Sequence, residues 1–273
     1  MQPTVPLVIE FLQELFDKGM GYSAINTARS AISSVITLPN NIPLGTHPLV
    51  RRFVKGVYNL RPSIPRYQFT WDVQKVLSFL GTLYPLCSLG LKELTHKLVM
   101  LTALVTGQRC QSIHLMDISN MQRTDKTIRF VITNLVKQSR PGKDQPVLIL
   151  PKYVDNKLCV VHTLDTYLDR TKLLRSNNKL FISTIKPHQE AAKDTISRWV
   201  KETMTLAGID ISMYSAHSTR SASSSAASRA KVPLTSIMKA ASWSQEDTFA
   251  KFYHKPLNNE HVYGLAVIDS HST

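Results

Sequence analysis

The sequence contains few cysteines and no long hydrophobic run. Its three cysteines, Cys87, Cys110 and Cys159, are odd in number and far apart, which argues against a disulfide framework or a zinc site. No segment approaches the ~20 consecutive apolar residues that span a bilayer, and the N-terminal segment lacks the charged and apolar stretches of a secretory signal. We therefore expect a protein of a reducing intracellular compartment, with no metal and no membrane partner.

Negative charge is scarce as well. The 273 residues include 19 Asp and Glu against 33 Lys and Arg, which gives a formal net charge of +14. Such a surplus favours a polyanionic partner, above all nucleic acid, because each phosphate that Lys or Arg neutralises releases condensed counterions. Hydrophobic residues still make up 43% of the chain, so it has enough of them to bury a core and is not a disordered basic tail.

The N-terminal part of the sequence predicts a small basic helical domain. Apolar residues recur at helical spacing over 7–16, 22–35 and 48–57, and we expect the first helix to stop at Gly19 and the second at Pro39. A loop rich in turn residues separates the second helix from the third. The two prolines and two arginines that follow predict an extended linker, because proline stiffens the chain. The expected boundaries are 1–62 for the helical domain, 63–68 for the linker and 69–273 for a second domain.

The second domain mixes helices with strands. A strongly apolar helix is predicted over 91–105, ending at Gly107, and alternating apolar residues predict two short strands joined as a hairpin. Residues 121–152, around that hairpin, hold seven basic and two acidic side chains. The expected fold is mainly α with a small β-sheet or hairpin. The other predicted elements are a helix over 73–80 capped by Thr70, strands at 128–132 and 146–151, a helix around 164–168 and a helix from Asp194 that stops at Gly208.

Residues suited to phosphoryl transfer follow one another along this domain. Arg109 comes directly after the apolar helix, and His217 and Arg220 share one face if their segment is helical. Trp243 comes 23 residues after Arg220, and Tyr253, with basic neighbours, comes ten residues later. In this order, and with a lysine on the basic hairpin, these residues resemble the tyrosine recombinases of the phage-integrase family.

Two short stretches are similar to one branch of these enzymes. The sequences KQSRPGK at 137–143 and WSQEDTFAKFY at 243–253 resemble recombinases of eukaryotic mobile elements such as DIRS-like retrotransposons and Cryptons. The resemblance covers essentially the whole chain. It implies a helical core-binding domain followed by a catalytic domain, a location in the nucleus and the integration of circular DNA copies.

The resemblance also implies a role for each residue at the reacting phosphorus. Tyr253 is the expected nucleophile, which forms a 3′-phosphotyrosine; its phenol has a reference pKa of ~10 and needs a base or a strong phosphate field. His217 is the expected general base. Arg109 and Arg220 are expected to hold the non-bridging oxygens, where negative charge gathers in the transition state. Tyr263 competes as nucleophile, but it lies in a tail-like segment.

The departing 5′-oxygen needs a proton, and the hairpin offers two candidates. Lys137 is the first choice for this general acid and Lys143 the alternative. The indole N–H of Trp243 is expected to donate a hydrogen bond to phosphate, while its ring packs against the tyrosine segment. Contacts to the DNA backbone are expected from Arg51, Arg52, Lys55, Arg140 and Lys143.

The implied partner is double-stranded DNA, held as two segments by four protomers. The segment after Tyr253 is expected to dock on a neighbouring protomer. Because the covalent link stores the phosphodiester energy, rejoining requires neither a nucleotide cofactor nor a metal.

The sequence departs from the family pattern at two positions. The residue three after Arg109 is often acidic in the family and is Ser112 here, and the residue before Trp243 is usually glycine and is Ser242 here. A side chain at position 242 is expected to strain a tight approach. These departures keep open a catalytically inactive DNA-binding protein derived from such an element. A type IB topoisomerase-like enzyme, which relaxes a single duplex, is a further alternative.

Overall fold

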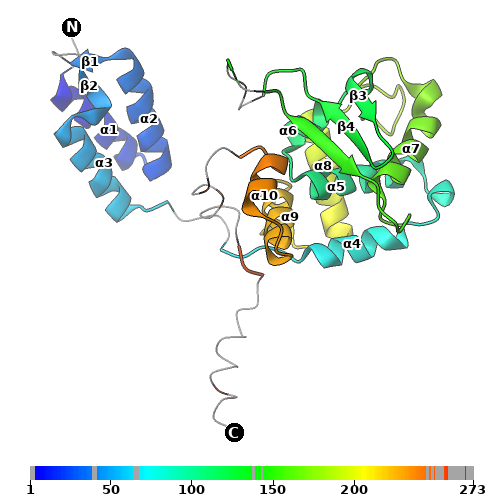
Figure 1. Ribbon diagram of the computed structural model, residues 1–273. Helices are drawn as coiled ribbons and strands as arrows, with labels where there is room; N and C mark the ends of the chain where they lie inside the picture. Colours follow the sequence, from blue (N-terminus) through cyan, green and yellow to red (C-terminus); the bar gives the residue numbers. More distant parts are fainter. Residues whose placement is uncertain are drawn as a thin grey trace. The chain divides into compact units, whose positions relative to one another are not determined.

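The computed structural model describes residues 4–38, 42–63, 68–136, 139, 141–142, 144–243, 246, 249, 255–257 and 268. The chain divides into two compact units, Met1–Arg66 and Tyr67–Thr273 (Figure 1). None of the helices in these described ranges is both long and apolar enough to cross a bilayer.

The first unit contains the three predicted helices. They bury one face each around a core that includes Leu12, Ile25 and Val54. The second helix ends at Val35, earlier than predicted, because Ile36 is already extended, with φ −118° and ψ 121°. The predicted loop holds a two-residue antiparallel hairpin. The elements are α1 (Val5–Asp17), α2 (Tyr22–Val35), β1 (Thr37–Leu38), β2 (Ile42–Pro43) and α3 (Pro48–Leu60).

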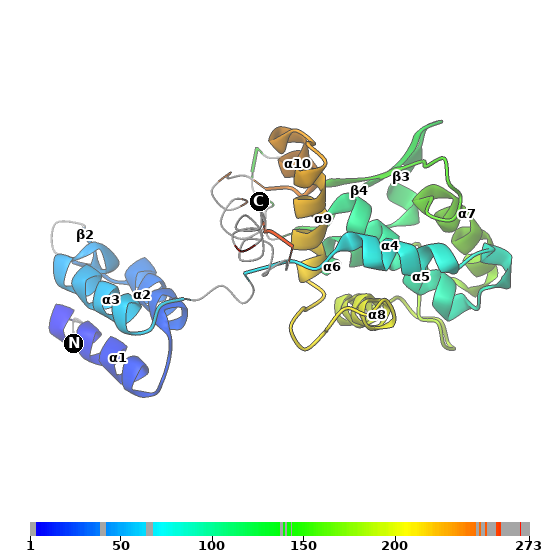
Figure 2. The same ribbon diagram turned by 90° about the horizontal axis from the view of Figure 1, so that it is seen from below.

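The second unit is mainly helical with one small antiparallel sheet, which confirms the predicted fold class. Helix α5 is buried along most of its length, and α7, α8, α9 and the sheet pack against it (Figures 1 and 2). The helices are α4 (Val73–Thr82), α5 (Leu91–Thr106), α6 (Cys110–His114), α7 (Val160–Thr171), α8 (Lys193–Leu206), α9 (Ser218–Arg229) and α10 (Leu234–Ala240). The sheet has the order β3-β4-β5, with β3 (Met121–Arg123), β4 (Thr127–Val131) and β5 (Val147–Pro151).

The predicted hairpin is confirmed as β4 and β5. Its register pairs Val131 with Val147, so residues 132–146 form the connection between the two strands. Ile128 and Phe130 point into the core, as the alternating pattern predicts. The third strand, β3, was not predicted, because Met-Gln-Arg carries no apolar alternation.

In the second unit, two predicted helix ends are confirmed and one predicted helix start is wrong. Gly107 and Gly208 take positive φ angles of +58° and +75° just after α5 and α8, as helix-stopping glycines do. The cap of α4, however, is Asp72, whose carboxylate accepts a hydrogen bond from the backbone N–H of Gln74 at 3.0 Å. Thr70 instead pairs with Leu257 in a parallel bridge.

A buried lysine links α5 to α4 and makes stability depend on pH. The Lys97 side chain is 0% exposed, and its Nζ donates to the carbonyls of Leu80 and Leu83 at 2.9 and 2.5 Å. Burial lowers the pKa of Lys97 to about 8. The unfolded chain, with the ordinary lysine pKa, therefore binds more protons between about pH 8 and pH 10.5, so stability rises with pH in that window.

We expect the Lys97→Met variant to lose this pH dependence. Between pH 8 and pH 10, the free energy of unfolding of the parent protein should gain about 2–3 kcal/mol relative to that of the variant. Urea unfolding at both pH values measures the difference. Equal pH slopes for the two proteins would contradict it.

Candidate active site

Three segments that are distant in sequence meet in the second unit. They are the turn after α5, the start of α9 and the end of α10. The side chain of Arg220, in the first turn of α9, joins them: its Nη1 donates to the Gly107 carbonyl at 2.7 Å and its Nη2 to the Ala241 carbonyl at 2.6 Å. Arg220 is only 1% exposed, so a buried guanidinium connects all three segments.

Backbone geometry at Gly107 places Arg109 at this meeting point. The positive φ of Gly107 ends α5, and a Cβ at this position would approach the Ser223 Oγ at 3.4 Å and the Ala241 Cβ at 3.6 Å. Arg109 is then extended as the N-cap residue of α6, with φ −76° and ψ 150°. Its side chain is half-buried, in contrast to the fully buried Arg220.

His217 immediately precedes α9 and lies close enough to both cations to feel their charge. It keeps access to solvent. Partial burial in the surrounding protein, then the positive charges of Arg220 and Arg109, lower its pKa below the ordinary histidine value. The structure therefore brings together Arg109, His217 and Arg220, and it keeps the imidazole in the neutral form that can accept a proton near neutral pH.

Trp243 packs at the same place. The guanidinium carbon of Arg220 lies 4.4 Å from the centroid of the Trp243 ring, a cation–π arrangement. The Trp243 ring also packs against the Phe249 ring, and the two ring centroids lie 5.2 Å apart. A cavity of about 660 Å³ borders this segment, and Val105, Arg129, Pro146 and Trp243 are among the residues that line it.

Ser242, the position where a glycine was expected, has φ +54°. Its backbone N–H donates to the Lys239 carbonyl at 3.2 Å, and the next N–H, of Trp243, donates to the Met238 carbonyl at 2.9 Å. These two bonds form a Schellman motif, which ends helices with a left-handed residue, most often glycine. The serine therefore does occupy a strained position, as the sequence suggested.

Gln108 is a residue of this site that was not predicted from the sequence. Its side chain is 3% exposed, and its Nε2 donates to the Ala240 carbonyl at 2.7 Å and to the Ser242 Oγ at 2.9 Å. The sequence shows a polar residue between Gly107, which ends a helix, and Arg109, and this was the feature that could have pointed to Gln108. Without the fold, nothing in the sequence indicates that this amide reaches residues more than 130 positions away.

Four predicted site residues lie outside the described residues: Tyr253, Lys137, Arg140 and Lys143. The described residues nearest to Tyr253 are held within their own unit. The backbone N–H of Lys255 donates to the Ser225 Oγ on α9 at 3.0 Å, and the N–H of Thr70 donates to the Pro256 carbonyl at 2.9 Å. Residues 255 and 256 thus contact α9 and the segment before α4 of the same chain, and the expected docking of the segment after Tyr253 on a neighbouring protomer stays a prediction.

The three residues of α3 that are predicted to contact DNA do not all line the same groove. Arg51, Arg52 and Lys55 are all exposed. Arg51 and Lys55 line a groove of about 390 Å³ between α2 and α3, whereas Arg52 does not. The groove is also lined by Arg29 from α2, which was not among the predicted DNA contacts. Its other lining residues are Tyr22, Asn26, Val54 and Tyr58.

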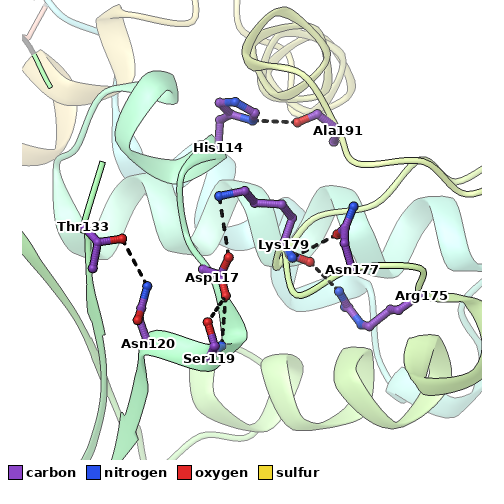
Figure 3. A network of polar contacts seen from close by, with 9 residues as sticks. All are labelled: His114, Asp117, Ser119, Asn120, Thr133, Arg175, Asn177, Lys179 and Ala191. Atoms are coloured by element: carbon purple, nitrogen blue, oxygen red, sulfur yellow. Dashed lines mark hydrogen bonds and ion pairs between the residues drawn. The ribbon is translucent and has the colours of Figure 1, made fainter. Parts of the chain in front are cut away.

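A polar network lies at the C-terminal end of α6 and in the segment that follows it (Figure 3). His114, at the end of α6, bonds through Nδ1 to the Ala191 carbonyl at 2.8 Å, and Asp117 forms a 3.6 Å ion pair with Lys179. Arg175 donates to the Lys179 carbonyl at 2.6 Å. His114 thus has a structural contact, and within the described ranges no group of three or more His, Cys, Asp or Glu side chains could hold a metal ion.

The cysteine beside Arg109 is not an alternative nucleophile. Burial raises the pKa of the Cys110 thiol, so it stays protonated near neutral pH. A protonated thiol is a poor nucleophile. This favours a structural role for Cys110.

Comparison with known proteins identifies the family. The model of the phage integrase family matches residues 74–259, and the chain belongs to this family. The XerH site-specific recombinase, in a post-cleavage complex with a palindromic difH substrate, is similar with a TM-score of 0.63 and 14% identity, over 98% of this chain and 73% of that one. No curated protein matches in sequence.

Two further solved structures share the fold. The Tn1549 transposon integrase, in complex with circular intermediate DNA, has a TM-score of 0.56 and 12% identity, over 96% of this chain and 85% of that one. Lambda integrase bound to DNA has a TM-score of 0.53 and 16% identity, over 95% of this chain and 83% of that one. The fold is thus that of the tyrosine recombinases.

Proposed function

We propose that this protein cleaves and rejoins double-stranded DNA through a covalent 3′-phosphotyrosine at Tyr253. The observation that carries the proposal is the convergence of Arg109, His217 and Arg220, from two segments about a hundred residues apart, in a member of the phage integrase family. Two cations beside a neutral imidazole suit an attack on a phosphodiester, whose transition state gathers negative charge.

In this mechanism the phenol oxygen of Tyr253 attacks the phosphorus, and His217 takes the phenolic proton. The bond from phosphorus to the 5′-oxygen breaks as the bond to the tyrosine forms. The leaving oxygen takes a proton from Lys137 or Lys143 on the hairpin connection. Arg109 and Arg220 stabilise the charge on the non-bridging oxygens, and rejoining reverses each step without ATP.

We propose two DNA segments and four protomers as the working assembly, within a eukaryotic mobile element of the DIRS-like or Crypton type that acts in the nucleus. The support is the likeness of residues 137–143 and 243–253 to such elements. The Tn1549 integrase, a transposon protein crystallised with a circular DNA intermediate, is a relative with a comparable role.

Adduct formation on a nicked duplex tests the proposal. A nick just beyond the cleavage site lets the short fragment that carries the freed 5′-hydroxyl diffuse away, so the covalent protein–DNA adduct accumulates and is resolved on a denaturing gel. A protein that retards the duplex but forms no adduct would be an inactive DNA-binding relative. Relaxation of supercoils without recombinant products would indicate a topoisomerase-like enzyme.

DNA binding should depend steeply on salt and on Arg51 more than on Arg52. Arg51 lines the basic groove of the first unit beside Arg29 and Lys55, and its neighbour Arg52 does not. Losing one phosphate contact lowers the slope of log K against log[salt] by about 1. We expect this change for Arg51→Gln, and a smaller one for Arg52→Gln, in anisotropy titrations between about 50 and 200 mM salt.

The two variants remove the same charge from adjacent positions, so each controls for the other. Equal losses for both would assign the effect to net charge rather than to the groove. A binding constant that does not respond to salt would contradict phosphate contacts altogether.

A further inference from the structure

The end of α10 needs a residue in the left-handed region, and the chain supplies a serine there. Residues with a Cβ adopt this conformation at a cost, and glycine does not. The turn after α9 is built the same way, with Lys231 at φ +60° and an N–H bond from Val232 to the Ala227 carbonyl at 3.0 Å. Only the turn after α10 lies against the convergence of Arg109, His217 and Arg220.

At that turn, buried side chains complete the hydrogen bonding that the helix end leaves open. The carbonyls of Met238 and Lys239 accept backbone N–H groups of the turn itself. The Ala240 carbonyl accepts from Gln108, and the Ala241 carbonyl accepts from Arg220. The same Gln108 amide also donates to the Ser242 hydroxyl, at 2.9 Å.

We propose that Gln108 is a positioning residue, which holds Ser242 in the left-handed conformation and thereby fixes Trp243 relative to Arg109. The proposal rests on the proposed DNA-cleaving function. Gln108 adjoins Arg109 in the chain, and Ser242 adjoins Trp243, so one amide couples the two segments across the site. The hydroxyl that makes residue 242 unlike glycine is also the group that Gln108 binds.

This coupling affects the reaction through geometry. Arg220 donates to the carbonyls of Gly107 and Ala241, which precede Gln108 and Ser242. Its guanidinium is therefore bonded to the same two segments that Gln108 connects. If the turn opens, the Trp243 ring and the Arg220 charge shift together. Catalytic groups displaced by about 1 Å can lose up to ~100-fold in rate.

The test replaces Gln108 by Met, which keeps the side-chain length and removes the donors. We expect Gln108→Met to form the covalent adduct about tenfold more slowly in single turnover with saturating protein, as loss of a buried hydrogen bond predicts, with an unchanged DNA Kd. In a Ser242→Gly background, where residue 242 adopts its conformation unaided, the same substitution should cost less than about twofold.

Two controls match these variants. Gln111→Met makes the same change at an exposed glutamine of α6 and should not slow adduct formation. Lys231→Gly places glycine in the corresponding turn after α9, and it should not rescue Gln108→Met. Ser242→Ala, which keeps the strained position but loses the hydroxyl, provides a second route to the same defect if Gln108→Met does not fold.

Hydrogen exchange of the Ser242 and Trp243 amides reports the turn whether or not DNA is cleaved. Faster exchange in Gln108→Met, restored by Ser242→Gly, supports the positioning role. If the parent protein forms no adduct while this exchange pattern holds, the proposed function fails and the positioning role stands. The positioning role would be overturned if Gln108→Met changed neither the exchange nor the adduct rate. It would also be overturned if Gln108→Met slowed adduct formation equally in the parent and in the Ser242→Gly background.

Discussion

Replacing Tyr253 by Phe should abolish the covalent adduct and leave DNA affinity unchanged. The substitution removes one oxygen, the atom proposed to attack the phosphorus, and keeps the ring. No neighbouring group is expected to take over, because Cys110 stays protonated and the phosphorus requires an in-line nucleophile. Denaturing gels of reactions on the nicked duplex measure the adduct, and anisotropy measures the affinity.

Tyr263→Phe is the matched control, since Tyr263 is the competing nucleophile in the sequence. An adduct that survives in Tyr253→Phe and disappears in Tyr263→Phe would reverse the assignment. Lys255, two residues after Tyr253, is bonded to α9, the helix that carries Arg220. We therefore expect Tyr253 and Arg220 of one chain to act on the same phosphate. A mixture of Tyr253→Phe and Arg220→Ala proteins should therefore not regain cleavage.

The sequence predicted the elements whose apolar pattern is strong. The helix predicted over 91–105 and the hairpin predicted from strands at 128–132 and 146–151 are examples, observed at 91–106 and 127–151, because burial on one or both faces dictates most of their residues. It did not predict β3, which follows from pairing with β4 rather than from its own side chains. The cap of α4 was misassigned because Thr70 and Asp72 are both good capping residues, and only tertiary contacts to Leu257 separate them.

Of the candidate site, the sequence predicted residues whose order carries the family resemblance. Arg109, His217 and Arg220 were selected in this way, and the structure places them together. Gln108 and Arg29 were not selected, because their importance depends on what lies opposite them in space. Gln108 faces the end of α10, and Arg29 faces α3 across the basic groove.

Ser242 stands where the family usually has glycine, and the structure explains how a serine is held there. From the sequence alone it indicated strain and possible loss of function. In the structure, the strain is present as a positive φ, and the Gln108 amide binds the serine hydroxyl. Strain of this kind persists when surrounding contacts over-determine it. The serine is therefore compatible with an intact site.

Replacing Arg220 by Ala should lower the cleavage rate by several powers of ten, equivalent to roughly 4 kcal/mol or more of transition-state stabilisation, by analogy with lost oxyanion donors. The substitution removes a buried positive charge from beside the proposed position of the reacting phosphate. It also leaves the Gly107 and Ala241 carbonyls without their donor, which costs about 1–3 kcal/mol of folding stability for each buried group. Single-turnover cleavage and urea unfolding measure the two losses separately.

Two further variants separate the charge of Arg220 from its structural bonds. Arg175→Ala removes another arginine that donates to a backbone carbonyl and lies over an aromatic ring, that of Tyr167, away from the site. It should lower stability and leave the cleavage rate of the folded protein near the parent value. Arg220→Lys keeps the charge but presents a single nitrogen to both carbonyls, so its rate should fall between those of the parent and Arg220→Ala. Cleavage by Arg220→Ala at a rate near that of Arg175→Ala would mean that Arg220 only holds the segments together, and that Arg109 alone stabilises the phosphate.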